Sequence, residues 1–232
     1  MTTVESDDWL SNLAKERADL DRSTTAERVA DKLRDSVLAG HIKPGRQLNE
    51  KALGEALRVS RNTLREAFRL LTHERLLVHE YSRGVFVRVP EVADIRDLYA
   101  ARRVIETGAV RHWDRAPEAA RQAVRDAVAL GVGRRERDDW SGVGTANVRF
   151  HQAVTALAGS SRLDEEMRRL LAELRLAFVV MGDSRVFYED YLTLNEEMLA
   201  HLDAGQVPEA ERAMLRYLDR AEEHLATGLR DS

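Results

Sequence analysis

The stretch "RVSRNTLREAFRLL", residues 58–71, carries two helical patterns on one segment. Apolar side chains recur at i, i+4 and i+7, the spacing of a buried helix face, and these are Leu64, Phe68 and Leu71. Basic side chains recur at i, i+4 and i+8 on a second face, and these are Arg61, Arg65 and Arg69. Because the arginines repel one another, we expect this helix to present them to an anionic partner.

Cap signals predict two more helices before this one. Thr24, with a glutamate three residues later, has the pattern of a capping box and begins the first helix. Asn49 can cap a second, short helix, in which Leu53 and Leu57 are expected to face inward. Ser60 can cap the third helix, which contains the arginines.

After the third helix, "LLVHEY" and "VFVRV" are short runs rich in β-branched and aromatic residues. The intervening "SRG" predicts a β-hairpin in which Gly84 forms the tight turn. Three helices and a hairpin, with a short turn between the second and third helices, predict a winged helix-turn-helix. Its third helix would lie in the major groove of DNA, with Arg61 and Arg65 near base edges and Arg69 near phosphate or solvent.

Charge divides the chain into a basic part and an acidic part. Residues 21–90 hold 14 Lys and Arg against 9 Asp and Glu, whereas residues 91–232 hold 20 against 26. A basic part joined to an acidic part predicts a polyanionic partner for the first part alone. A charged face that is merely solvated is the alternative explanation.

The segment "LRDSVLAGHIKPGRQLNEKALGEALRVSRNTLREAFRLLTHERLL", followed by "SRGVFV", resembles the DNA-binding domain of the GntR family of bacterial transcription regulators. The resemblance covers roughly residues 24–90. It implies that the operator is contacted by Lys51, Ser60, Arg61, Asn62, Arg65, Arg83 and Gly84. Of these residues, Arg83 and Gly84 would form the wing tip and enter the minor groove.

Two places depart from the family pattern. Asn62 and Thr63 stand where the family often has Thr and Pro, so we expect Asn62 to alter base preference. Arg75 stands where the family usually has glycine after the recognition helix. If the backbone at Arg75 is left-handed, the non-glycine residue costs about 1 kcal/mol.

Beyond Pro90 the chain is expected to be all-helical. Leucine and alanine spacing predicts an antiparallel bundle. Its helices are expected near residues 91–113, 117–130, 139–158, 162–181, 184–204 and 207–229. The segments "DLYAARRVIETGAV", "NVRFHQAVTALAGS" and "NEEMLAHLDAGQVPEAERAMLRYLDRAEEHL" resemble the effector domain of the FadR subfamily, called FCD. This resemblance implies a central pocket and dimerisation.

Many members of the FadR subfamily hold a divalent metal with one aspartate and three histidines. The four corresponding positions here are Asn147, His151, Asn195 and Tyr217. His201 and His224 lie too far round or along their helices to replace the missing ligands. Neutral amides and a phenol are poor partners for zinc or nickel beside a single imidazole, so we expect no metal and no other cofactor.

Arg102 matches a family position whose arginine often neutralises a carboxylate of the effector. The resemblance therefore implies a small anionic metabolite bound by Arg102, Asn147, His151, Asn195 and Tyr217. Two simpler explanations stay open. Arg102 could pair with Glu106 as an ordinary i,i+4 salt bridge, and His151 could equally be a hydrogen-bonded core histidine.

These features predict a mainly α-helical protein with three parts. The parts are an N-terminal arm (1–22), a winged helix-turn-helix domain (23–90) and an FCD-like effector-binding and dimerisation domain (91–232). We expect a homodimeric repressor that binds a pseudo-palindromic double-stranded DNA operator. The chain has no cysteine, no apolar stretch typical of a signal peptide and no apolar run long enough to cross a bilayer, so we expect a cytoplasmic protein with no membrane association.

Two other classes of protein are alternatives to this interpretation. A metal-dependent or hydrolytic enzyme could be built on the bundle, but the sequence shows no Ser-His-Asp order, phosphate-binding glycine loop or complete set of metal ligands. A nonspecific architectural DNA binder would not need so large a bundle with a pocket.

Overall fold

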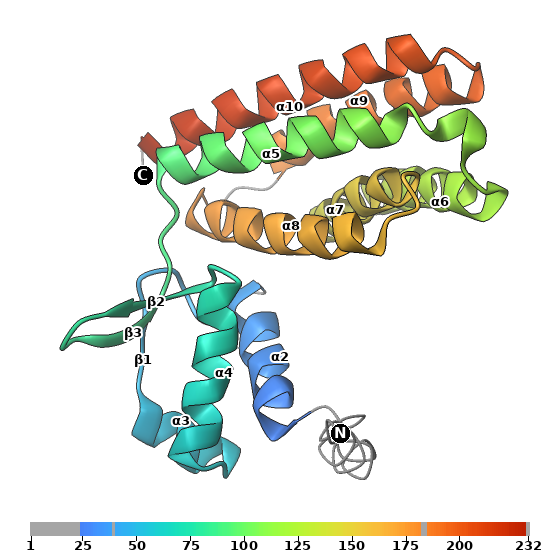
Figure 1. Ribbon diagram of the computed structural model, residues 1–232. Coiled ribbons are helices and arrows are strands. Elements are labelled where there is room, and N and C mark those ends of the chain that lie inside the picture. The colour runs from blue at the N-terminus through green and yellow to red at the C-terminus, as the bar shows by residue number, and fades with distance from the viewer. Residues whose placement is uncertain (1–23, 39, 182–184, 231–232) are drawn as a thin grey trace, which may run out of the picture.

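The computed structural model describes residues 24–38, 40–181 and 185–230, so the predicted N-terminal arm lies outside the described part of the chain. A small module of helices and strands lies beside a bundle of longer helices (Figure 1). The small module consists of α2 (Thr25–Leu38), β1 (Gln47–Leu48), α3 (Glu50–Leu57), α4 (Arg61–His73), β2 (Leu77–Glu80) and β3 (Gly84–Val87). The mainly α-helical fold is as the sequence predicts.

The three helices of the small module begin where their cap residues predict. Thr24 N–H donates to Glu27 Oε2 at 2.6 Å, and Glu27 N–H donates to Thr24 Oγ1 at 3.2 Å, which completes the capping box of α2. The side chains of Asn49 and Ser60 accept hydrogen bonds from backbone N–H groups in the first turns of α3 and α4, at 2.9 Å and 3.1 Å. The apolar face predicted for α4 is buried, as Leu64, Phe68 and Leu71 show.

The sheet of the small module contains one strand that the sequence pattern did not predict. β2 and β3 form the expected antiparallel hairpin, and Gly84 begins β3 at a φ of +107°. The two-residue strand β1 pairs with the other edge of β3, which gives the order β1-β3-β2. The inward orientation expected for Leu57 is wrong, because this side chain is 37% exposed and the short helix α3 rests on the core through Leu53.

In the part of the bundle that the structure describes, six long helices have bounds close to the predicted ranges. They are α5 (Val92–Val110), α6 (Glu118–Arg135), α7 (Trp140–Ala156), α8 (Ser161–Met181), α9 (Arg185–Asp203) and α10 (Val207–Arg230), with a 3-10 turn η1 (Trp113–Arg115) after α5. α5 and α10 run side by side over much of their length (Figure 1). The inner faces of the bundle helices form one continuous apolar core.

Helix α8 is the part of the bundle that packs against α2 (Figure 1). Leu176 of α8 is fully buried in the core of the small module. Arg88, just after β3, reaches the bundle through Asp94 of α5 at 2.5 Å and Glu173 of α8 at 3.5 Å. The two modules therefore share apolar packing and ion pairs, and both involve α8.

The backbone at Arg75 is left-handed, with a φ of +58°, so the cost that we expect of a non-glycine residue in this conformation applies. Replacing Arg75 with glycine should raise the free energy of unfolding by about 0.5–1 kcal/mol. The relief of about 1–2 kcal/mol of backbone strain is partly offset by about 0.4–1 kcal/mol from the greater freedom of the unfolded chain. Urea denaturation measures the change. Arg75→Ala keeps the strain and loses only the exposed pair with Asp97, so a stabilisation equal to that of glycine would contradict the prediction.

Candidate functional site

The residues predicted to meet DNA lie on one exposed surface of the small module. Arg61, Asn62 and Arg65 are exposed on α4, opposite its buried face, and Lys51 is exposed on α3. A groove of about 460 Å³ runs between α3, α4 and the strands. It is lined by Glu50, Arg65, Phe68, Arg69, Thr72, His79 and Val85. A groove beside an exposed basic helix N-terminus suits docking into the major groove of DNA.

The basic residues of this surface differ in their internal partners. Arg65 Nε lies 3.3 Å from both carboxylate oxygens of Glu50, and Arg69 donates to Glu66 at 3.1 Å and 2.6 Å. Within the described part of the chain, Arg61 makes no ion pair. Ion pairs in contact with solvent contribute little to stability, so Arg65 and Arg69 can exchange a carboxylate for DNA at little cost.

Ser60 has a structural role besides its predicted contact with DNA. Its hydroxyl accepts the N–H of Thr63 at 3.1 Å and lies 2.8 Å from the hydroxyl of Thr63. The side chain therefore fixes the first turn of α4, from which Arg61 and Arg65 project. A direct contact of Ser60 with DNA stays a prediction.

The wing tip formed by Arg83 and Gly84 is held from the side of β1. The amide of Gln47 donates to the carbonyl of Arg83 at 2.6 Å. The guanidinium of Arg83 pairs with Glu80 and lies 5.4 Å from the ring centroid of Phe86. These contacts fix the backbone of the tip while the Arg83 side chain remains exposed.

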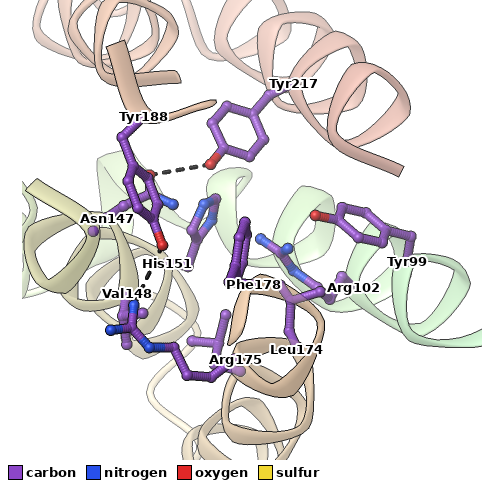
Figure 2. Close-up of a pocket in the computed structure, with 12 residues that line it drawn as sticks. Tyr99, Arg102, Asn147, Val148, His151, Leu174, Arg175, Phe178, Tyr188 and Tyr217 are labelled. Atoms are coloured by element: carbon purple, nitrogen blue, oxygen red, sulfur yellow. Dashed lines mark hydrogen bonds between the residues drawn. The ribbon is translucent and has the colours of Figure 1, made fainter. Parts of the chain in front are cut away.

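A buried cavity of about 20 Å³ lies where α5, α7, α8, α9 and α10 meet (Figure 2). It is lined by Tyr99, Arg102, Gly144, Asn147, Val148, His151, Leu171, Leu174, Arg175, Phe178, Tyr188 and Tyr217. A Cβ atom on Gly144 would lie 2.7 Å from the ring of Tyr188, so glycine is needed for this ring to approach α7. A cavity of this size holds about one water molecule.

Arg102, Glu106 and His151 form a buried polar group beside the cavity. Arg102 Nε donates to Glu106 Oε1 at 2.7 Å, and His151 Nδ1 lies 2.6 Å from Glu106 Oε2. All three side chains are at most 1% exposed. The guanidinium of Arg102 also lies 4.8 Å from the ring centroid of Tyr99. The i,i+4 pair of Arg102 with Glu106 is thus present, yet Arg102 Nη2 and His151 Nε2 have no hydrogen-bond partner among the described residues.

Asn147 connects the other predicted pocket residues. Its Oδ1 accepts a hydrogen bond from Asn195 Nδ2 at 2.8 Å. The same oxygen accepts a hydrogen bond from the hydroxyl of Tyr217 at 3.1 Å, which Figure 2 shows. Asn147 and Tyr217 line the cavity, whereas Asn195 does not and lies against Asn147 instead. The structure therefore brings all five predicted residues together, with four of them at the cavity: Arg102, Asn147, His151 and Tyr217.

These residues do not fit the metal held by many FadR-subfamily members. The oxygen of Asn147 already accepts two hydrogen bonds, and of the described residues that line the cavity His151 alone carries an imidazole. His201 contacts Gln206 and His224 contacts Tyr191, away from this position. Among the described residues no group of three or more His, Cys, Asp or Glu side chains could hold a metal ion.

The environment of the buried group sets its protonation. Burial alone would raise the pKa of the Glu106 carboxyl, but Arg102 and His151 outweigh burial and lower it. Burial lowers the pKa of the His151 imidazole, and Arg102 adds to this while Glu106 opposes it. At neutral pH Glu106 is therefore ionised and His151 is neutral. Since a carboxylate only accepts, His151 Nδ1 carries the proton and Nε2 is left as an acceptor.

Sequence reasoning missed several residues of this site. The sequence predicts Glu106 only as a partner for Arg102, although Tyr99, Arg102 and Glu106 follow at i, i+3 and i+7 on one helix face. That spacing could have placed a charged pair on the inner side of α5. Arg175 and Tyr188 carry no such local signal, because only tertiary packing brings them to the cavity.

Comparison with known families identifies the chain. Residues 25–87 match the profile of the bacterial regulatory proteins of the gntR family, and residues 97–220 match that of the FCD domain. The chain belongs to the GntR family of transcription regulators. A GntR DNA-binding domain followed by an FCD domain is the architecture of the FadR-like subfamily. The matched families and relatives are transcription regulators and not enzymes.

Individual relatives agree with this assignment. The Nta operon transcriptional regulator of Aminobacter aminovorans is 30% identical over 66% of this chain and 73% of that protein. A crystal structure of a GntR transcriptional regulator from Rhodococcus sp. RHA1 is 42% identical, with a TM-score of 0.79 over 88% of this chain and 98% of that chain. McbR/YncC of E. coli shares the fold, with 18% identity and a TM-score of 0.72 over 89% and 99% of the two chains.

Over the residues that the structure covers, no helix combines the length and the apolar character needed to cross a bilayer.

Proposed function

We propose that this DNA-binding regulator is a homodimeric repressor whose binding to a pseudo-palindromic operator is modulated by a small organic anion in the bundle. The residues proposed to contact the operator are Lys51, Ser60, Arg61, Asn62, Arg65, Arg83 and Gly84. One observation supports the binding of an anion: Arg102 Nη2 lies at a buried cavity and has no hydrogen-bond partner among the described residues. Leaving a buried charged donor unpaired is costly, so this atom favours a ligand that accepts from it.

The proposal of repression rests on the DNA-binding half. The gluconate operon transcriptional repressor of Bacillus licheniformis is 35% identical over 88 residues, which are 38% of this chain and 36% of that protein. A winged helix-turn-helix that occupies a promoter-proximal operator in the absence of ligand represses by excluding other proteins. Release by a ligand then requires that the ligand binds the DNA-free arrangement more tightly than the DNA-bound one.

The buried polar atoms suggest the chemistry of the ligand. A carboxylate oxygen of the ligand would accept from Arg102 Nη2, and a hydroxyl of the ligand would donate to His151 Nε2. Apolar atoms would meet Leu171, Leu174 and Phe178. Because the cavity holds about one water molecule, any organic ligand must move some of these side chains on binding.

A thermal-shift screen of small carboxylates and hydroxycarboxylates tests the anion site. A ligand that binds only the folded state at a hundredfold excess over its Kd should stabilise the protein by about 2.7 kcal/mol. Arg102→Lys keeps a positive charge beside Glu106 but removes the Nη2 donor, so it should abolish this stabilisation. A stabiliser that acts equally on wild type and Arg102→Lys would contradict the role of Arg102.

The assembly makes a separate prediction. The full-length protein without DNA should sediment as a dimer, because two-fold related half-sites require two recognition helices in fixed relation. The FCD-like domain, residues 91–232, is the larger module and is proposed to hold the dimer contact. Sedimentation of this fragment should therefore also give a dimer, and a monomeric fragment beside a dimeric full-length chain would place the contact in the DNA-binding half.

A further inference from the structure

Arg175 lies between the buried cavity and the DNA-binding half. It lines the cavity, and it also lines a groove of about 360 Å³ between α2, α7 and α8. The cavity and the groove share three lining residues, Val148, Leu171 and Arg175. A movement of these side chains would join the cavity to the groove, which makes the groove a route for a ligand.

The contacts of Arg175 link the bundle to α2. Arg175 Nη1 donates to the hydroxyl of Tyr188 at 3.3 Å (Figure 2), and Arg175 Nε donates to the carbonyl of Leu38 at 3.2 Å. Leu38 is the last residue of α2, where carbonyls lack partners within the helix. A cation at this end also interacts favourably with the helix dipole. Arg175 thus completes the C-terminus of a helix in the other module.

Charge distinguishes the two arginines of the cavity. The charge of Arg102 is balanced by Glu106 at 2.7 Å. Arg175, by contrast, contacts no carboxylate within the described part of the chain, since its two partners are a carbonyl and a hydroxyl. Arg175 therefore offers an anion at the cavity a positive charge that no carboxylate of the described residues already neutralises, beside the donor that Arg102 supplies. A guanidinium binds a carboxylate best through two parallel N–H donors on one of its edges. In Arg175, one such edge includes the Nε–H that is bonded to the carbonyl of Leu38.

We propose that Arg175 couples ligand binding to the DNA-binding half: the acidic group of the ligand takes the guanidinium of Arg175 from the carbonyl of Leu38. This proposal rests on the anion site proposed above. It adds Arg175 as a residue that binds the charge of the ligand, and the groove as the route by which the ligand enters. With the ligand bound, the carbonyl of Leu38 at the end of α2 loses its hydrogen bond to α8. Without the ligand, Arg175 holds α2 against the bundle.

The end of α2 is connected to the recognition helix. Arg34 of α2 donates to Glu74 at the end of α4 through Nε at 2.7 Å and Nη2 at 2.6 Å. The buried face of α2 also packs against α4 within one apolar core. A shift of α2 relative to α8 would therefore carry α4 with it, and would change the spacing of two recognition helices in a dimer.

Hydrogen exchange without ligand tests the first half of the proposal. The amides of Gly40, His41 and Ile42 donate to carbonyls of Val37 and Ser36 at the end of α2. Arg175→Ala should make these amides exchange about tenfold faster, because a hydrogen bond from a charged donor is lost. Arg168→Ala is the matched control, since Arg168 lines the groove on the same helix but does not line the cavity. If Arg175→Ala lowers the melting temperature strongly, Arg175→Gln serves in its place.

The second half of the proposal, the effect of the ligand on Arg175, is tested with acetate, lactate and benzoate. Each acid is compared with its neutral amide at constant ionic strength. An acid that stabilises the wild type should speed exchange at residues 40–42 as Arg175→Ala does, and its amide should not. The acid should add nothing to exchange in Arg175→Ala. A stabilising acid that leaves exchange at residues 40–42 unchanged, or changes it equally in Arg175→Ala, overturns the coupling role. If none of the acids stabilises the wild type, the anion site itself is contradicted and the coupling proposal fails with it.

Discussion

Replacing Glu106 with alanine should lower the free energy of unfolding by about 3–5 kcal/mol, as expected when one partner of a buried ion pair is removed. Glu106 is fully buried and accepts from Arg102 on one oxygen and from His151 on the other. Without the carboxylate, the guanidinium of Arg102 is left in the core with no counter-charge, and the N–H of His151 loses its acceptor. Urea denaturation followed by circular dichroism measures the loss.

Glu165→Ala is the control for this prediction. Glu165 pairs with Arg169 four residues later, but both side chains are about half exposed, so its removal should cost at most about 0.5 kcal/mol. Equal losses for Glu106→Ala and Glu165→Ala would show that the buried pair has no special energetic role.

The pH dependence of the wild type follows from the same buried group. The folded-state pKa of Glu106 lies below its ordinary value of 4.5, and that of His151 lies below 6.5. In each case the unfolded chain takes up the proton first as the pH falls, so stability is complete above the ordinary value and is lost below it. The wild type should therefore lose stability below pH 6.5 and again below 4.5. Glu106→Ala should show a smaller second loss, because Glu106 no longer contributes while Glu66, Glu118, Asp139 and Glu211, whose pKa values are also lowered, still do.

Arg65→Ala should weaken binding to the specific operator by about 1–3 kcal/mol, which is roughly 5- to 150-fold, through loss of a bidentate base contact. Arg65 is exposed on α4 and bonded to Glu50 at 3.3 Å, so its removal leaves no buried group unpaired and should not disturb the fold. Fluorescence anisotropy with an operator selected from random DNA, and with a scrambled sequence, measures the change.

Lys51→Ala is the comparison for Arg65→Ala. A lysine that contacts phosphate should weaken binding to both DNAs evenly and flatten the dependence on salt, whereas Arg65→Ala should reduce the preference for the operator. If wild type binds operator and scrambled DNA equally well, the protein is an architectural DNA binder and not a sequence-specific regulator.

The local features of the DNA-binding half could be read from the sequence. The burial of Leu64 and Phe68 follows from helical periodicity, and the cap at Asn49 follows from a side chain that reaches its own helix. Both depend on residues a few positions apart. β1 could not be predicted in this way, because two residues carry no periodicity and the strand exists only through its pairing with β3.

The bundle site was predictable in its parts but not in its connections. The resemblance to the FCD domain brought Asn147, Asn195 and Tyr217 to one place, and the structure joins them by hydrogen bonds. The contact of His151 with Glu106 spans 45 residues, and that of Arg175 with Leu38 spans 137. Contacts at such separations depend on how the helices pack, which the spacing within one helix does not specify.

The contact of Gln47 with the wing tip has a consequence for the entropy of DNA binding. A free hairpin tip would have to be ordered in the minor groove, at about 1–2 kcal/mol for each backbone residue that becomes fixed. Here the amide of Gln47 already bonds the carbonyl of Arg83, and β1 pairs with β3 on the same side. The backbone of the tip is thus held in place before DNA arrives, and the freedom lost on binding is mainly that of exposed side chains such as Arg83 and Tyr81.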